Sequence, residues 1–479
     1  MSLRTQIVDA VKWSVAGRLA SQIVTWGITI FIIRLLNPDD YGLIALAGIF
    51  TTSFSVVSEL GLGSALVRTQ DLSAERIRQI FGIIIISNIV VFLMLLIVVS
   101  YVAGDFFDDK RLIVVIQLLS IQFILSIFII IPSALLNRSM EFRGRAIIDF
   151  VSTLIGAVFT LFLAYFKYEV YSLVWGNLAQ TLVRAVGLNL VQKSIGWPIF
   201  KFSGCGSMVK FGGNISGSQL VWMFYSQSDI FLVGKFLGNN ILGVYTVAMD
   251  LASLPSTRFS AILNQILYPS LAKIQREGGL IAPYLLKGMS AISLVFFPVM
   301  WGMASISQEI FLIFLGEKWL QSAMPFAFLC VIMPFRVQST VMHAGFHAVG
   351  RADYSFKITC IISGVMFSSF VVGIQFGLLG ICLAWGIVYP SLFFYFYYKS
   401  DVMLGFSKRE HFVSLVRPTM ATIIMCGAVV FARLNLAEKV NPMTSLAILI
   451  FVGVVTYVLL SFLINRKGVD ETLSLFRSK

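Results

Sequence analysis

Arg336, His343 and His347 are spaced so that, on an α-helix, their side chains lie within about 20° of one line. Such a face attracts a phosphate or another anion, because a guanidinium offers bidentate hydrogen bonds and the imidazoles offer titratable charge. The two histidines are also four residues apart, as in a metal-ligand pair, but no third ligand is evident. The sequence therefore predicts an anion-binding face here, with no metal.

Further polar residues interrupt other apolar stretches, where a charged side chain is costly unless it faces a cavity. Those that we expect on cavity-facing sides are Arg18, Gln22, Glu59, Trp222, Tyr225, Asp229, Asp250 and Arg258. The arginines are candidates for attracting an anion and the aromatic rings for stacking. The three acids are candidates for binding a coupling ion or balancing the arginine charges.

Structural interpretations of the same residues stay open. Arg18, Arg34 and Arg184 could be anchors whose long side chains reach the membrane surface. Asp250 and Arg258 could form a buried ion pair. For Arg336, near the middle of its apolar stretch, a cavity role is the better interpretation.

The composition places these residues in an integral membrane protein. The 479 residues are 58% hydrophobic and only 12% charged, against roughly 25% charged residues in a soluble domain. The apolar runs suit α-helices that cross about 30 Å of hydrocarbon, and they are too long and uniform for membrane β-strands. The net charge of +13 comes from basic loops beside apolar runs, which indicates membrane orientation and not nucleic-acid binding.

Apolar windows predict an all-α fold with about fourteen transmembrane helices. Their expected ranges are residues 12–36, 41–67, 79–102, 112–136, 146–166, 170–190, 211–237, 241–271, 283–306, 323–349, 354–374, 378–398, 413–432 and 443–464. We therefore expect an N-terminal six-helix lobe over residues 1–200 and a C-terminal six-helix lobe over residues 201–400. Residues 401–479 would add two transmembrane helices and a short cytoplasmic tail.

The two halves carry the signs of a duplication. Residues 34–47 (RLLNPDDYGLIALA) are echoed without gaps by residues 235–248 (KFLGNNILGVYTVA). Three further matches keep the same order: Pro132 with Pro334, Gly144-Arg145 with Gly350-Arg351, and Trp175-Gly176 with Trp385-Gly386. An even number of spans in each half makes the repeats parallel, and we expect their polar faces to line one central vestibule.

Sidedness follows from the positions of Lys and Arg. With a cytoplasmic N-terminus, roughly 25 basic residues fall in inner connections and about 8 in outer ones, a strong positive-inside asymmetry. We therefore expect both termini in the cytoplasm. No cleavage pattern of a signal peptide is evident, so the first apolar stretch is expected to stay as a membrane anchor.

Enzyme classes find no support in the sequence. It contains no Gly-x-x-x-x-Gly-Lys-Ser/Thr loop for phosphates and no Gly-x-Ser-x-Gly or His-Glu-x-x-His motif. No long segment between the apolar runs leaves room for a soluble catalytic domain. We expect no catalytic residue and no cofactor, and any energy that the protein needs must come from elsewhere.

Three segments together resemble the bacterial polysaccharide-export flippases of the multidrug/oligosaccharidyl-lipid/polysaccharide exporter superfamily. These are residues 34–47, residues 59–68 (ELGLGSALVR) and residues 267–275 (LYPSLAKIQ). The chain is most similar to the colanic-acid-exporter branch. The likeness covers both six-helix halves, whereas the last two predicted helices are less distinctive.

The resemblance implies a V-shaped pair of six-helix bundles in the bacterial inner membrane, with a central cationic vestibule. The implied substrate is a polyprenyl-pyrophosphate-linked oligosaccharide, flipped from the cytoplasmic to the periplasmic leaflet by alternating access for exopolysaccharide or lipopolysaccharide assembly. A proton or sodium gradient, or the membrane potential, is the implied driving force. Expected partners are membrane lipids and polysaccharide polymerase machinery. In such a site Arg336 and Arg258 would attract the anionic head, while Trp222 and Tyr225 would stack on sugar rings.

Two other interpretations stay open. One is a drug, metabolite or cation antiporter of the same superfamily, although the basic face that holds Arg336 disfavours cationic drugs. The other is a membrane-embedded glycan polymerase, which usually presents a sizeable outer loop with catalytic residues. Here the longest outer connection, near residues 307–322, is short. The sequence does not single out a sugar repeat or a coupling ion, because specificity is a difference of small affinities.

Overall fold

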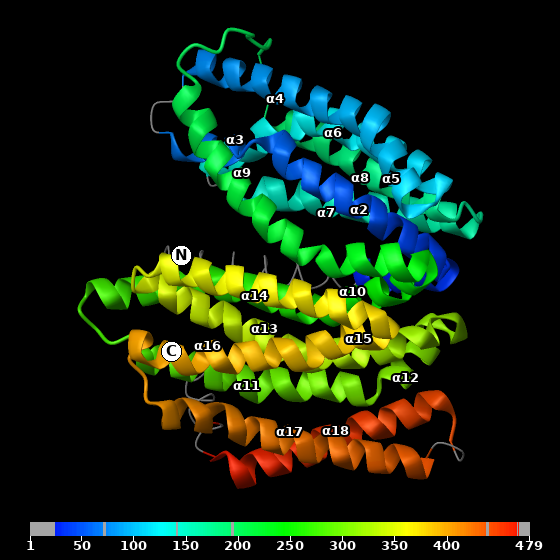
Figure 1. The fold of residues 1–479 in the computed structure, drawn as a ribbon, viewed down its shortest axis with the longest axis vertical. Coiled ribbons are helices and arrows are strands. Elements are labelled where there is room, and N and C mark those ends of the chain that lie inside the picture. The colour runs from blue at the N-terminus through cyan, green and yellow to red at the C-terminus, as the bar shows by residue number, and fades with distance from the viewer. Residues whose placement is uncertain are drawn as a thin grey trace, which may run out of the picture. The chain divides into compact units, whose positions relative to one another are not determined.

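The protein is an all-helical membrane protein in its computed structural model (Figure 1). The structure describes residues 24–69, 73–139, 142–192, 196–436, 440–466 and 468, and every regular element in them is a helix. Ten helical stretches among these residues are long and apolar enough to cross a membrane. The chain divides into two compact units, Met1–Gly243 and Val244–Lys479. The lobe boundaries near residues 200 and 400 stay a prediction.

The first unit begins its described part with the apolar helix Val24–Leu35. Its further helices are α2 (Pro38–Glu59), α3 (Leu62–Arg68), α4 (Ala74–Met94), α5 (Ser100–Phe107), α6 (Lys110–Arg138), α7 (Phe142–Tyr165), α8 (Val170–Val191), α9 (Gly206–Ser226) and the start of α10 (Ser228–Arg276). A π-helical turn, Leu95–Val99, joins α4 to α5. An apolar core that includes Leu66, Ile84 and Ile131 packs α3, α4 and α6 together.

The second unit holds the remainder of α10 and the helices that follow. These are α11 (Ala282–Ser305), α12 (Ser307–Ile310), α13 (Ala323–Ala348), α14 (Ala352–Gly373), α15 (Gly377–Leu383), α16 (Tyr389–Leu404), α17 (Lys408–Leu436) and α18 (Pro442–Ile464). Helix α13 packs against α11, α14 and α16, and α17 and α18 pack beside each other. Buried Gln338 of α13 fixes the contact with α11, since its amide donates to Met289 O at 2.9 Å and to Ser293 Oγ at 2.8 Å.

The predicted ranges agree closely with several helices. The stretch predicted at residues 112–136 is α6, and the stretch predicted at residues 146–166 is α7. Helix α8 forms where it was expected, whereas the stretch predicted at residues 211–237 is divided between α9, which ends at Ser226, and the start of α10. Polar residues keep α8 and α9 outside the ten apolar spans. Because the first predicted helix begins outside the described residues, a total of fourteen spans stays a prediction.

A break divides the second predicted helix, which the apolar pattern of residues 41–67 had made continuous. Leu60 (φ 50°) and Gly61 (φ 59°) both adopt left-handed backbone conformations between α2 and α3. The close approach of α9 gives the physical reason, because a Cβ on Gly212 would lie 2.1 Å from Leu60 O. Glu59 is therefore the last residue of α2 and sits beside an interrupted helix.

The two copies of the repeated turn contact each other in matching ways. A Cβ on Gly42 would lie 1.8 Å from Asn239 O, and a Cβ on the corresponding Gly243 would lie 1.7 Å from Pro38 O. Only glycine permits backbones to approach this closely. Next to the contact, Gly238 (φ 82°, ψ 172°) interrupts the helical conformation of α10.

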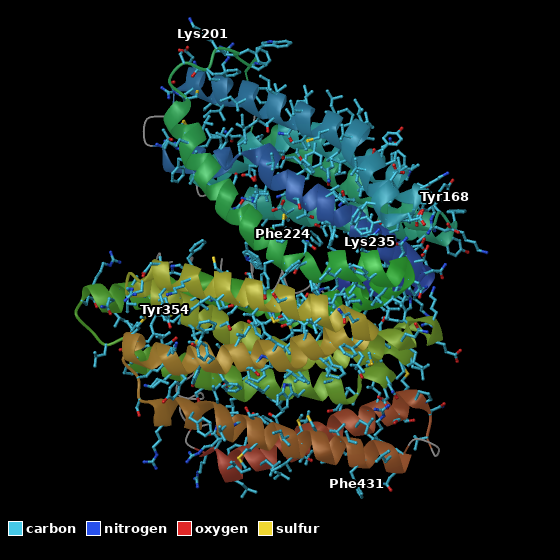
Figure 2. The ribbon with its side chains drawn as sticks, in the orientation of Figure 1. Tyr168, Lys201, Phe224, Lys235, Tyr354 and Phe431 are labelled. Atoms are coloured by element: carbon cyan, nitrogen blue, oxygen red, sulfur yellow. The ribbon has the colours of Figure 1, made fainter. Side chains whose placement is uncertain are left out.

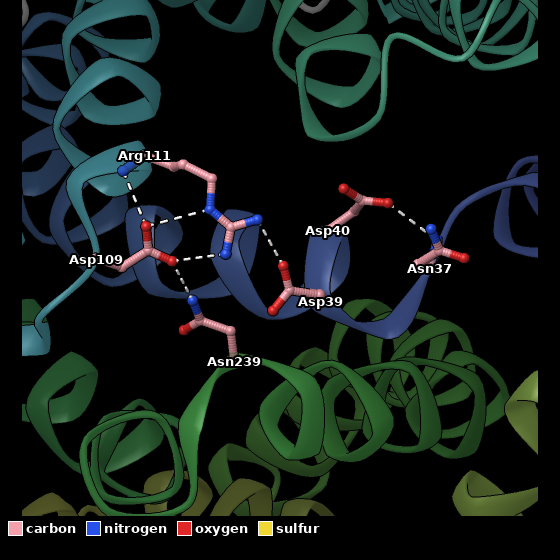
Figure 3. A network of polar contacts seen from close by, with 6 residues as sticks. All are labelled: Asn37, Asp39, Asp40, Asp109, Arg111 and Asn239. Atoms are coloured by element: carbon pink, nitrogen blue, oxygen red, sulfur yellow. Dashed lines mark hydrogen bonds and ion pairs between the residues drawn. The ribbon is translucent and has the colours of Figure 1, made fainter.

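A polar network fastens the same region (Figure 3). The guanidinium of Arg111 donates to Asp39 Oδ2 at 2.7 Å and to Asp109 Oδ2 at 2.8 Å. Asn239 Nδ2 donates to Asp109 Oδ2 at 2.7 Å. The network joins the start of α2, the turn before α6 and the kinked part of α10.

Candidate functional site

Arg336 lies in α13, which belongs to the most buried of the ten spans. Its guanidinium carbon is 5.4 Å from the centre of the Trp385 ring, a cation–π contact. Trp385 is oriented by its Nε1–H, which donates to Tyr245 OH at 2.9 Å. Among the described residues Arg336 has no acidic partner within ion-pair distance. An intramembrane cation without a carboxylate partner is available to a bound anion.

The two histidines of the predicted face differ in their surroundings. His343 is half-buried, and its Nδ1 shares a 2.6 Å hydrogen bond with Ser355 Oγ of α14. Beside it, the ring centres of Phe346 and Tyr354 (labelled in Figure 2) lie 5.1 Å apart. His347 is exposed in the last turn of α13. The site thus combines one fixed imidazole, one exposed imidazole and the half-buried Arg336.

The aromatic residues predicted on the seventh stretch lie on α9. Trp222 is 47% exposed, and its ring centre lies 6.1 Å from that of half-buried Tyr225. Phe224 on the same helix is 72% exposed (Figure 2). Asp229 instead is buried, and its Oδ1 accepts a hydrogen bond of 2.9 Å from the N–H of Ile230. The Asp229 carboxylate is thus hydrogen-bonded to the backbone in the first turn of α10.

The other predicted site residues are placed only in part. Asp250 lies on α10 with an exposed side chain and forms no ion pair within the described part of the chain. The side chain of Arg258, its predicted partner, lies outside the described residues, as do Arg18 and Gln22. The Asp250–Arg258 ion pair therefore stays a prediction.

Glu59 lines a cavity in the first unit, which we call the Arg145–Arg184 pocket. Its volume is about 480 Å³, and its polar lining comes from α2, α3, α6, α7 and α8. The polar residues that line it are Glu59, Ser64, Ser133, Asn137, Arg145 and Arg184. The carboxylate of Glu59 has no hydrogen-bond or ion-pair partner among the residues that the structure describes.

Asp149 holds the two arginines of the pocket. Its Oδ1 lies 2.9 Å from Arg184 Nε and its Oδ2 lies 3.5 Å from Arg145 Nε, in ion pairs. Arg145 Nη1 also donates to Asn137 Oδ1. Two guanidinium groups around one carboxylate leave a net positive charge and unused N–H donors.

No pattern in the sequence brings these groups together. Arg184 was predicted as a possible surface anchor, and no site role was predicted for Arg145 or Asp149. One signal was available, because Arg145 and Asp149 are four residues apart on one helix face, the spacing of an ion pair. Arg184 lies on α8 and Glu59 on α2, and no local spacing in the sequence predicts that they line the same pocket.

Comparisons with known proteins agree with this architecture. A family model described as "Polysaccharide biosynthesis protein" matches residues 31–324. The lipopolysaccharide biosynthesis protein WzxC of Escherichia coli (strain K12) is 23% identical, over 87% of this chain and 86% of its own length.

Two solved structures share the fold. A lipid II flippase MurJ in an inward closed conformation matches with a TM-score of 0.78 and 16% identity, over 96% of this chain and 100% of that chain. An inward-facing multidrug resistance MATE family transporter of the MOP superfamily matches with a TM-score of 0.58 and 14% identity, over 84% and 93%. The family match spans more than half of the 479 residues. The chain of this multi-pass membrane protein therefore belongs to the polysaccharide biosynthesis protein family.

Proposed function

We propose that this protein flips polyprenyl-pyrophosphate-linked oligosaccharide repeat units from the cytoplasmic to the periplasmic leaflet of a bacterial inner membrane. Both termini lie in the cytoplasm, and the product feeds exopolysaccharide or lipopolysaccharide assembly together with polysaccharide polymerase machinery. Within the family we assign the chain to the colanic-acid-exporter branch, without singling out a sugar repeat. The family match and the fold shared with a lipid II flippase support this proposal.

Arg336 carries the proposal. It sits in a membrane-spanning helix against Trp385, without a carboxylate partner in the described structure. A lipid-linked sugar has its negative charge on the pyrophosphate and its bulk in the rings, so it requires a cation beside aromatic surfaces. Trp222, which is 47% exposed, and half-buried Tyr225 provide an aromatic surface for sugar rings.

Transport uphill needs an energy source, which we assign to a proton or sodium gradient or to the membrane potential. Glu59 and Asp250 are the acids best suited to bind the coupling ion, since neither has an ion-pair partner within the described residues. Asp229 is a weaker candidate because its carboxylate already accepts a backbone hydrogen bond.

The test is flipping in proteoliposomes. A fluorescent polyprenyl-pyrophosphate oligosaccharide is placed in the membrane, and its exposure to a membrane-impermeant quencher is followed with and without an ion gradient. We expect faster exposure than in empty vesicles, a dependence on one gradient, and loss of flipping in Arg336→Ala. The control is Arg351→Ala, which removes an arginine just beyond α13 that is ion-paired to Asp353. Unimpaired flipping by folded Arg336→Ala would remove this residue from the mechanism.

The alternative is a small-molecule or cation antiporter, which the fold shared with a MATE family transporter favours. It predicts no flipping of any lipid-linked sugar and altered drug susceptibility in a deletion strain. The cation–π site of Arg336 disfavours a cationic substrate, because like charges repel. A glycan polymerase is the remaining possibility, and chain extension by the purified protein would support it.

A further inference from the structure

We infer that the Arg145–Arg184 pocket, whose lining does not include Arg336, binds the phosphate group of an amphiphile. The inference rests on the proposed function only for the identity of the amphiphile, a polyprenyl pyrophosphate. The chemistry it assigns to the pocket, an anionic phosphate at the end of an apolar chain, is shared by substrate and phospholipid. All residues that line the pocket belong to the first unit.

The pocket offers hydrogen-bond donors that the protein itself leaves unused. Arg184 engages Asp149 through Nε alone, and within the described residues its two terminal nitrogens have no partner. Arg145 uses Nε and Nη1, which leaves Nη2. The hydroxyls of Ser64 and Ser133 also line the cavity and make no hydrogen bond with any described group. Guanidinium forks and hydroxyls are the groups that proteins use to hold phosphate oxygens.

Asp149 prepares the two arginines for this task. It lies between them and neutralises one of the two positive charges, so the three groups keep a net charge of +1. A carboxylate that holds two guanidinium groups also restricts their rotamers, which lowers the entropy lost when a ligand binds. Asp149 therefore orients both guanidinium groups toward an anion while it neutralises only one of their two charges.

One wall of the pocket is apolar and suits the chain of an amphiphile. Val67, Ile129 and Ile130 line it, and Ile129 and Ile130 come from the same helix as Ser133 and Asn137. A volume of about 480 Å³ is sufficient for a pyrophosphate group with the first carbons of its chain. Inorganic phosphate alone would leave the apolar wall wet.

Glu59 adds a charge that opposes the ligand. With it, the pocket holds two positive and two negative groups: Arg145, Arg184, Asp149 and Glu59. Among the described residues, Glu59, Arg145 and Arg184 are the charged groups that line the cavity, and Asp149 is ion-paired with the two arginines. Neutralising Glu59 leaves a net charge of +1 and favours an anion. Glu59→Gln should therefore tighten phosphate binding.

Direct binding to the purified protein tests the site. The background is Arg336→Ala, so that the site proposed in α13 does not mask the pocket. Three probes are compared in nanodiscs or detergent: a fluorescent polyprenyl pyrophosphate, phosphatidylglycerol and inorganic pyrophosphate. We expect Arg184→Gln and Arg145→Gln each to weaken polyprenyl pyrophosphate binding about tenfold or more, because each removes charge-assisted hydrogen bonds. Glu59→Gln should tighten it severalfold.

The matched control is Arg143→Gln, which removes an exposed arginine from the same end of α7 without lining the pocket, and which should leave the dissociation constant unchanged. Arg184→Lys keeps the charge and loses the fork, so it should bind with intermediate affinity. Preference for polyprenyl pyrophosphate identifies a substrate site. Equal affinity for phosphatidylglycerol identifies a lipid headgroup site. Equal affinity for inorganic pyrophosphate would show that the apolar chain is not recognised and would contradict the inference.

Two results would overturn the inference: no binding of any probe, or unchanged affinity in folded Arg184→Gln. Weaker binding by Glu59→Gln would contradict it as well, and misfolding cannot produce the expected tightening. If flipping fails while the pocket binds, the proposed function fails and the phosphate site stands. If flipping persists while Arg184→Gln and Arg145→Gln bind normally, the phosphate site fails and the proposed function stands.

Discussion

Replacing Gly243 with alanine tests the close contact between the two copies of the repeated turn. The new Cβ would lie 1.7 Å from Pro38 O, whereas real Cβ atoms essentially never come within 3.0 Å of a non-bonded heavy atom elsewhere in the chain. The obstacle is a main-chain oxygen in the first turn of α2, so no side chain can rotate away. The backbone must move by more than about 1 Å to relieve the overlap.

The expected cost follows from this geometry. Overpacking costs about 1–3 kcal/mol, and a rigid backbone neighbour places Gly243→Ala near the upper end. In a unit of this size, 1 kcal/mol shifts the unfolding temperature by about 2–4 °C, so the midpoint should fall by roughly 6–12 °C. Gly42→Ala should act similarly, because its Cβ would lie 1.8 Å from Asn239 O.

Thermal unfolding of the purified protein in detergent, followed by tryptophan fluorescence, measures the effect. The control is Gly48→Ala in α2, where an added Cβ would meet nothing within 4 Å. Alanine is the better helix former by about 1 kcal/mol, so Gly48→Ala should leave the midpoint unchanged or raise it. If Gly243→Ala and Gly48→Ala unfold at the same temperature, the close approach of the two turns is refuted.

Three further predictions concern polar contacts, each checked by unfolding temperature. Burial raises the pKa of the Asp109 carboxyl, but hydrogen bonds from Arg111 and its charge outweigh burial and hold that pKa below its ordinary value. The stabilisation that Asp109→Asn removes should therefore be complete above pH about 4 and should decline as the pH falls through the lowered pKa. A difference in unfolding temperature that does not change with pH would contradict this. Arg433→Gln should cost about 2 kcal/mol because it strands the largely buried Glu309, 2.8 Å away. Adding Glu309→Gln should restore part of that loss. Ser355→Ala should cost about 1 kcal/mol by removing the 2.6 Å hydrogen bond to His343. An unchanged unfolding temperature would show that this bond is not formed.

Helix positions could be predicted from the sequence because they depend on local properties. A run of apolar residues long enough to cross hydrocarbon must satisfy its backbone hydrogen bonds internally, and only a helix does so within one segment. Helices α6 and α7 accordingly begin and end within four residues of the predicted positions. The echo between residues 34–47 and 235–248 likewise placed Gly42 and Gly243 at equivalent positions.

The candidate site was predicted less completely, because helical spacing reports which residues share a face and not what lies opposite. It placed Arg336 and His343 on one helix, where they are found, but it gave no indication of Trp385 as the ring beneath the guanidinium. It selected Glu59 as an unusual acid, but it did not bring Arg145 and Arg184 to the same cavity.

By itself, the sequence determined that this is a helical membrane protein with an internal sequence echo and with charged residues inside its predicted spans. The tertiary structure decided where α2 ends and which charges meet. Leu60 and Gly61 leave the helical conformation because Gly212 of α9 approaches their backbone. Asp149 and Arg184 meet because α7 and α8 pack side by side. Apolarity is a property of one segment, whereas a close approach depends on two segments that are distant in the chain, so only the folded structure reveals it.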